Sequence, residues 1–414
     1  MSEPADSTVY RDRDFYVFAA VRFIVTIAMQ VQSVAIGWQV YAITHSTFAL
    51  GMVGLCQFAP MFLLILPAGD ISDRFDQRKV LSTTQAMQSV CAALFLALVL
   101  FAPKTVWPYY AVLVLFGATR GFYGPASQSL LPFLVNAEKL PRAIALSSSV
   151  FTTATIAGPA AGGFVFALGA HITFSLSLAL MLLASVLTAT LGGRQRPLHV
   201  DTGASRLERV KEGVDFVRHR PVVLGAISLD LFAVLLGGAT ALLPVYARDI
   251  LHAGPVGLGF LRAGPALGAA LMAFSLARWP IRRHTGIIMF AAVAVFGVAT
   301  IAFGVSRSFY VSLGALAVLG ASDMISVFVR SALIQYATPD SMRGRVSAVS
   351  MLFIGASNEL GEFESGITAD WFGTVPAVVI GGIGTLFVVG TWMGLFPPLR
   401  KIDRLADAAN APVT

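Results

Sequence analysis

Four ionisable side chains lie deep inside long apolar segments of this sequence: Arg120, Asp323, Glu359 and Glu362. If each segment is a membrane-crossing helix, Arg120 lies about 18 Å from the nearer helix end. A charge at that depth costs roughly 3 kcal/mol or more unless it is paired or hydrated. Glu359 and Glu362 are three residues apart, so they share a helix face and each disfavours ionisation of the other. We therefore expect Asp323 or one of the two glutamates to carry a proton, with Arg120 as the basic partner of Asp323. Local hydrogen bonds, of Arg120 with Ser127 or Gln128 and of Asp323 with Ser326, are the alternative.

Three further intramembrane charges can be matched by their depth in the segments. Asp230 and Arg330 lie toward the same end of their segments and are at the right depth to form an ion pair. Arg262 lies toward the opposite end, within reach of Glu359 or Glu362. Each pairing has two interpretations, an ion pair that only fixes helix packing or a part of a coupling site.

The composition requires a membrane to hold these segments. The 414 residues are 56% hydrophobic and only 12% charged, about half the charged fraction of a soluble domain. Because a helix needs about 20 residues to cross a bilayer, the apolar runs predict an all-α membrane protein with about twelve transmembrane helices. The predicted spans are 15–43, 48–69, 80–102, 107–134, 143–168, 172–192, 221–246, 256–278, 285–305, 309–336, 345–369 and 375–397.

The longest polar stretch divides these spans into two sets of six. We expect an N-terminal bundle over 1–194, a basic cytoplasmic linker over 195–220 and a C-terminal bundle over 221–414. Lys and Arg gather in alternate loops, which places both termini and the linker in the cytoplasm. This bias accounts for the net charge of +7, so we expect the lipid bilayer as a partner and no nucleic acid.

The two halves repeat at one offset. Gly117 and Gly320 are 203 residues apart, as are Gly158 and Gly361. Arg120 and Asp323 occupy equivalent positions in this repeat. The repeat predicts two six-helix bundles related by a pseudo-two-fold axis, with Arg120 and Asp323 facing each other across a central cavity. Chance agreement of small residues in apolar helices is the alternative.

A charged motif joins the second and third spans. It comprises Gly69, Asp73, Arg74, Arg78 and Lys79, with Asp76 at a position where glycine is usual. This spacing resembles the loop signature of the major facilitator superfamily, whose members consist of two repeated six-span bundles. The resemblance implies a short cytoplasmic loop that closes a gate, with Asp73 contacting the start of the eleventh span. An ordinary charged loop is the alternative.

Two further segments resemble motifs of the same superfamily. Gly158, Pro159, Gly162 and Gly163 resemble its antiporter motif, although Ala154 replaces the first glycine. This likeness implies export, and ordinary helix packing by small residues is the alternative. The segment that begins at Arg120 resembles a motif linked with proton coupling. By resemblance, spans one, four, seven and ten line the cavity, and the expected lining side chains are Gln30, Trp38, Phe122 and Tyr123.

Several short matches resemble the group that contains the bacterial enterobactin exporter, of the transmembrane secretion effector type. They include Arg22-Phe-Ile and Ser357-Asn-Glu-Leu-Gly361. The resemblance implies a monomeric carrier in the inner membrane that exports a siderophore or another small hydrophobic molecule in exchange for protons. Uptake, lipid translocation and a receptor role are the alternatives. Because no metal-ligand spacing, phosphate loop or nucleophile elbow is present, we expect no enzyme activity, no catalytic or metal-binding residue and no cofactor.

Overall fold

The computed structural model describes residues 6–101, 105–136, 139–192, 206–339 and 342–410. These residues form helices and short turns, and no strand occurs among them. The chain divides into two compact units, the first made of Met1–His45 and Cys56–Thr202 and the second of Ser46–Leu55 and Gly203–Thr414.

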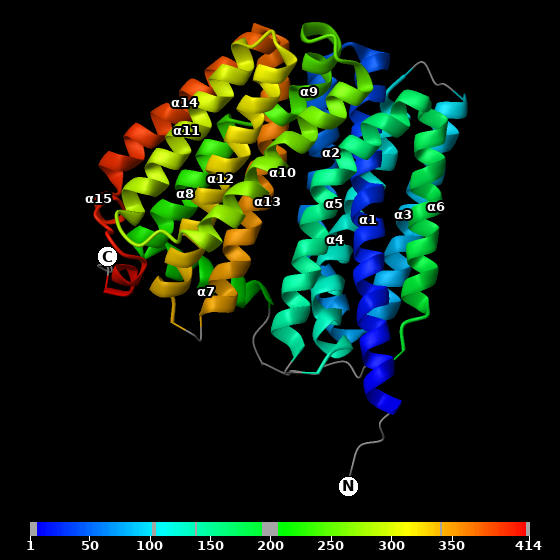
Figure 1. The fold of residues 1–414 in the computed structure, drawn as a ribbon, viewed down its shortest axis with the longest axis horizontal. Coiled ribbons are helices and arrows are strands. Elements are labelled where there is room, and N and C mark those ends of the chain that lie inside the picture. Colours follow the sequence, from blue (N-terminus) through cyan, green and yellow to red (C-terminus); the bar gives the residue numbers. More distant parts are fainter. Residues whose placement is uncertain (1–5, 102–104, 137–138, 193–205, 340–341, 411–414) are drawn as a thin grey trace. The chain divides into compact units, whose positions relative to one another are not determined.

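The first unit is a bundle of long helices (Figure 1). The helices are α1 (Asp6–Thr44), α2 (Thr47–Arg74), α3 (Gln77–Phe101), α4 (Trp107–Leu134), α5 (Leu140–Leu168) and α6 (Ala170–Ala189). Helix α1 packs against α5 and α6, and α3 packs against α4 and α6. The first residues of α2 belong to the second unit.

The second unit contains six further membrane-length segments and several short elements. They are α7 (Arg206–Arg218), α8 (Pro221–Leu236), η2 (Ala239–Leu242), α9 (Leu243–Val245), η3 (Tyr246–Ile250), α10 (Gly254–Arg278), α11 (Thr285–Val305), α12 (Phe309–Ala337), α13 (Arg343–Phe372), α14 (Thr374–Leu395), α15 (Pro397–Arg400) and η4 (Leu405–Asn410). Helix α12 packs against α10 and α11, while α8 packs against α13 and α14.

The long helices are those of a multi-pass membrane protein. Ten segments in the described part of the chain are long and apolar enough to cross a membrane. The two long helices that fall outside this set are α4 and α13, which contain the ionisable residues Arg120, Glu359 and Glu362. Large apolar side chains cover the outside of both units, for example Phe101 at 83% exposure and Phe274 at 76%. Such exposure is costly in water and favourable in hydrocarbon.

The predicted spans match the observed helices closely, but two segments differ. The seventh predicted span is not one continuous helix: α8 ends at Leu236, and η2 begins after Gly237 and Gly238. Two consecutive glycines are poor helix formers, and Pro244 follows within the next turns. The expected loop over 69–79 is also shorter than predicted, because α2 continues to Arg74 and α3 begins at Gln77.

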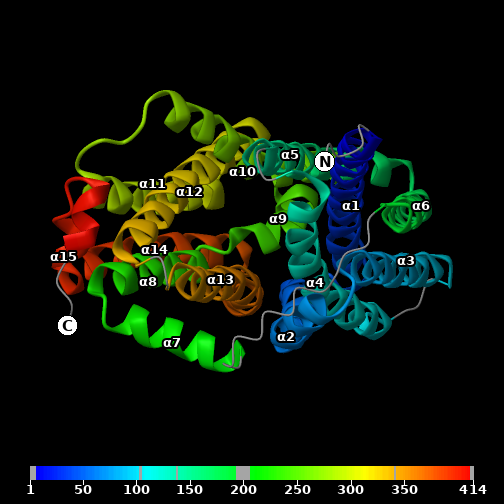
Figure 2. The same cartoon turned by 90° about the horizontal axis from the view of Figure 1, so that it is seen from below.

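The predicted linker contains a helix. Helix α7 lies beside α8 and α13 (Figure 2). Position Gly213 of α7 is so close to α13 that an added methyl group would lie 2.9 Å from the carbonyl oxygen of Arg345. Arg345 also pairs with Glu212 of α7 at 2.7 Å. This polar helix is therefore packed onto the second unit.

Each unit contains a helix crossing at equivalent glycines. A methyl group at Gly158 of α5 would lie 2.6 Å from Cβ of Gln30 in α1. A methyl group at Gly361 of α13 would lie 2.9 Å from the carbonyl oxygen of Val234 in α8. Gly158 and Gly361 are separated by 203 residues and Gln30 and Val234 by 204. Small residues allow such close approach of membrane helices, so the sequence repeat corresponds to one repeated packing feature.

Candidate functional site

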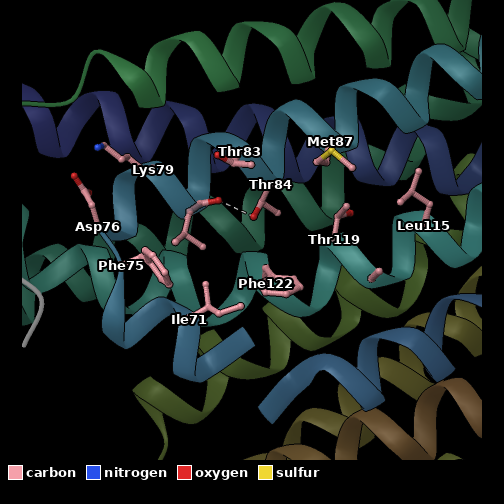
Figure 3. Close-up of a pocket in the computed structure, with 12 residues that line it drawn as sticks. Ile71, Phe75, Asp76, Lys79, Thr83, Thr84, Met87, Leu115, Thr119 and Phe122 are labelled. Atoms are coloured by element: carbon pink, nitrogen blue, oxygen red, sulfur yellow. Dashed lines mark hydrogen bonds between the residues drawn. The ribbon is translucent and has the colours of Figure 1, made fainter. Parts of the chain in front are cut away.

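A groove in the first unit has a volume of about 670 Å³. Its walls are the end of α2, the first turns of α3 and the middle of α4 (Figure 3). Apolar and small side chains line most of it. They are Ile71, Phe75, Val80, Thr83, Thr84, Met87, Leu115, Ala118, Thr119 and Phe122. Pockets of roughly 300–1,000 Å³ with mainly apolar walls are typical of small-molecule sites.

The groove has a charged end and an apolar end. Asp76 and Lys79 lie at one end, while Met87 and Leu115 lie toward the other (Figure 3). Asp76 and Met87 are eleven positions apart, which corresponds to about 16 Å along a helix. A molecule with one polar and one apolar part matches this arrangement.

The predicted cavity residues are divided between this groove and the helix packing around it. Phe122 lines the groove. Tyr123 instead packs against buried clusters of α1, α4 and α6. Gln30 and Trp38 lie at the contact between α1 and α5, where the Gln30 amide donates to the carbonyl oxygen of Thr155 at 3.4 Å and the Trp38 ring centroid is 6.3 Å from that of Phe166.

The antiporter-like segment forms the close contact of α5 with α1. Gly158, Pro159, Gly162 and Gly163 are all buried. A methyl group at Gly162 would lie 2.9 Å from Cα of Val31. These small residues therefore form a packing contact between α5 and α1.

Arg120 is hydrogen-bonded to a glutamine of a neighbouring helix. Its Nη1 atom donates to Oε1 of Gln57 in α2 at 3.1 Å. The two helices approach closely here, because Gly117 of α4 packs directly on the backbone of Gln57. Arg120 and Asp323 lie in different units, and their expected coupling stays a prediction.

The charged motif between the second and third spans is described only in part. Arg78 donates from Nη1 to the carbonyl oxygen of Leu191 at 2.5 Å, and its Nη2 atom lies 3.7 Å from Asp76. These contacts connect the start of α3 with the end of α6. Lys79 is exposed at the end of the groove. Gly69 and the side chains of Asp73 and Arg74 lie outside the described residues, and so does the expected contact of Asp73.

A buried ion pair lies in the second unit. The guanidinium of Arg330 in α12 contacts the carboxylate of Asp230 in α8. Their side chains are only 2% and 7% exposed. Removing one partner from such a pair leaves an uncompensated buried charge, which typically costs 3–5 kcal/mol.

Asp323 lies beside this pair. Asp230, Asp323, Ser322 and Ser326 line one small cavity together with apolar side chains of α8 and α11. Its volume is about 10 Å³, which is roughly the space that one water molecule needs. The structure thus brings together two carboxylates that the sequence analysis placed in separate pairs.

The C-terminal half of α13 forms a second ionisable cluster. Arg262 of α10 interacts electrostatically with Glu362. Glu362 lies against α2, since a methyl group at Gly54 would be 3.1 Å from its Oε2 atom. Glu359 lies on the same face, with its carbonyl oxygen 3.3 Å from that methyl position. Arg262 therefore interacts with one of the two glutamates that its position along the eighth predicted span placed within its reach.

One residue of these sites, Gln57, was not expected from the sequence, whereas Ser326 was expected near Asp323. Gln57 is a lone amide within the apolar part of α2, and its polarity alone could have marked it as a partner for Arg120. Ser326 lies three residues after Asp323 and four before Arg330 on α12, which puts all three on one helix face. That spacing was visible in the sequence, whereas the neighbouring cavity was not.

Comparison with known proteins agrees with this architecture. The family model described as transmembrane secretion effector matches residues 8–413. An enterobactin exporter of Shigella boydii serotype 18 is 25% identical over 371 residues, covering 88% of this chain and 84% of that protein. An enterobactin exporter of Escherichia coli O1:K1 has the same identity and coverage.

Solved structures share the fold at low sequence identity. A bacterial homologue of the human lysosomal transporter Spinster, inward-facing and occupied, has a TM-score of 0.73 at 14% identity, covering 95% of this chain and 97% of that one. A D-xylose-proton symporter has a TM-score of 0.68 at 14% identity, covering 93% and 98%. With the family model matched over nearly its whole length, this chain belongs to the transmembrane secretion effectors, membrane transporters of the major facilitator type.

Proposed function

We propose that this transporter exports a small hydrophobic or amphipathic molecule, such as a siderophore or a drug, in exchange for protons. It works by alternating access from the inner membrane, with both termini in the cytoplasm. The groove between α2, α3 and α4 carries the proposal, because its apolar wall and its Asp76 and Lys79 end suit a molecule of mixed polarity (Figure 3).

Two further observations support the outward direction and the proton. The curated relatives are named enterobactin exporters, and the segment around Gly158 resembles the antiporter motif. Ionisable side chains inside the spans, among them Asp323 and Glu362, are the kind of group that a proton-coupled carrier requires.

Transport in everted membrane vesicles tests direction and coupling. We expect an imposed proton gradient to drive uptake of a fluorescent amphipathic dye or a catecholate siderophore into such vesicles, and an uncoupler to stop it. Sodium-dependent or exclusively inward transport would contradict the proposal. Transport of a lysolipid in place of the soluble probes would favour the alternative of lipid translocation, which the same groove could support.

Filling the groove tests its part in substrate binding. Ala118 lines the groove, so Ala118→Phe should raise KM for the transported probe about tenfold or more, the effect of losing 1–3 kcal/mol of apolar contact. Val114 is the matched control because it lies one turn away on α4, is 45% exposed and does not line the groove. If Ala118→Phe and Val114→Phe raised KM equally, the groove would not be the substrate-binding site.

A further inference from the structure

The small cavity between α8, α11 and α12 has the features of an ion-coupling site. Ser326 is 2% exposed, and its Oγ atom has no hydrogen-bond partner within the described part of the protein. Buried hydroxyl groups are normally hydrogen-bonded. Asp230, Asp323 and Ser322 line the same cavity, so four oxygen-bearing side chains surround a space for one water molecule.

The charges around the cavity do not balance. Asp230 is compensated by its ion pair with Arg330. Asp323 forms no hydrogen bond or ion pair with any of the described residues. When Asp323 is ionised, the group of two aspartates and one arginine therefore holds one negative charge within apolar helices. One monovalent cation makes the group neutral.

The helices packed on α12 supply no other balancing charge to this cavity. Helix α11 contains no titratable residue, and Asp230 is the only one in α8. On α10 the charged groups are Arg262, which interacts with Glu362, and Arg278 in the last turn. The remaining acidic groups are Asp407 of η4 and Glu359, Glu364 and Asp370 of α13. The remaining basic groups are the arginines at the start of α13.

We propose that Asp323, Ser326 and Asp230 form a binding site for one proton, which Asp323 carries as a carboxylic acid next to a single water molecule. The proton forms an O–H bond with one Asp323 oxygen on loading and passes to the cavity water on release. A metal cation fits less well, because Asp230 already contacts Arg330 and the hydroxyl of Ser322 donates to the carbonyl oxygens of Val318 and Leu319 at 2.8 and 2.9 Å.

This inference deepens the proposed function by giving the coupling proton a location, and it rests on that function for its physiological role. The site is complete within the second unit. Asp323 is partly exposed, whereas Asp230 and Ser326 are buried. Asp323 is therefore the member of the group that can exchange a proton with its surroundings.

Infrared difference spectroscopy on the full-length protein in lipid nanodiscs tests the site without substrate. The C=O stretch of protonated carboxyl groups is recorded through a pH titration. We expect Asp323→Asn to lose one titrating carboxyl group per molecule. If that variant does not fold, Asp323→Glu should keep the titration but move its midpoint, because the longer side chain displaces the carboxyl group within the cavity.

A pair of serine variants makes the test specific. In the proposed site the Ser326 hydroxyl stabilises ionised Asp323 through the cavity water, so Ser326→Ala should raise the titration midpoint by about one pH unit. Ser322→Ala is the matched control, since Ser322 lines the same cavity but is already bonded to helix carbonyls. Equal midpoints in the two serine variants would overturn the site, as would an unchanged titration in Asp323→Asn or an unchanged midpoint in Asp323→Glu.

Replacing choline by sodium at constant ionic strength tests whether the site binds a proton or a metal cation. A midpoint that is independent of sodium is expected, and a midpoint that falls with sodium would overturn the proton assignment in favour of a metal cation. Failure of the site and failure of the proposed function are distinguishable. Proton binding without proton-driven export would refute only the function, and proton-driven export without this titration would refute only the site.

Discussion

Replacing Arg330 by methionine should strongly destabilise the second unit. The substitution keeps an apolar chain of similar length but leaves Asp230 without its cation. Because the two side chains are only 2% and 7% exposed, solvent does not screen the lost interaction. Breaking such a buried pair costs about 3–5 kcal/mol, which corresponds to a fall in Tm of roughly 6–20 °C for a unit of about 200 residues.

A double-mutant cycle measured by thermal unfolding in detergent checks this value. Asp230→Asn alone should be similarly damaging, and Arg330→Met combined with Asp230→Asn should be less damaging than the two losses added together. Arg345→Met is the control, because its pair with Glu212 is 36% and 49% exposed and exposed pairs contribute only about 0–1 kcal/mol. Additive losses, or a loss no larger than in the control, would refute the reasoning.

Three further substitutions test individual contacts. Gly117→Ala should lower Tm and weaken transport, because its methyl group would enter the backbone of α2, whereas Gly124→Ala should be neutral since nothing lies within 4 Å of that position. Gln57→Leu removes one acceptor of Arg120 and should lower stability by about 1.5–3 kcal/mol, measured by thermal unfolding in detergent. Gly54→Ala should slow transport more than it lowers Tm, because its methyl group would lie 3.1 Å from a carboxylate oxygen of α13; a change in Tm without a change in transport would argue against this.

The positions of the long helices were predictable because apolar runs and their charged or glycine-containing breaks are local features. The break after Leu236 was not predicted, since Gly237 and Gly238 lie inside a run whose apolarity continues on both sides. Depth along the segments was sufficient to match Asp230 with Arg330, which the structure brings together. The common cavity with Asp323 depends on how three helices pack, and no spacing along a single helix contains that information.

The groove was also beyond the sequence analysis. It is formed where α2, α3 and α4 separate, although the same α2 and α4 touch closely at Gly117. Phe122 was expected to line a cavity between spans one, four, seven and ten, whereas the groove that it lines lies between α2, α3 and α4. Tyr123, the next residue, points into helix packing instead, because consecutive residues of a helix face different directions.

The contact between α10 and α12 has a consequence for distance measurements on this transporter. Gly268 of α10 packs on the backbone of Ala317, and Gly320 of α12 packs on the backbone of Pro265. With two backbone-to-backbone contacts, neither helix can turn or slide without a steric clash. Spin labels placed on exposed positions of α10 and α12 should therefore give one narrow distance under all conditions, and that distance can serve as an internal ruler for motions elsewhere in the protein.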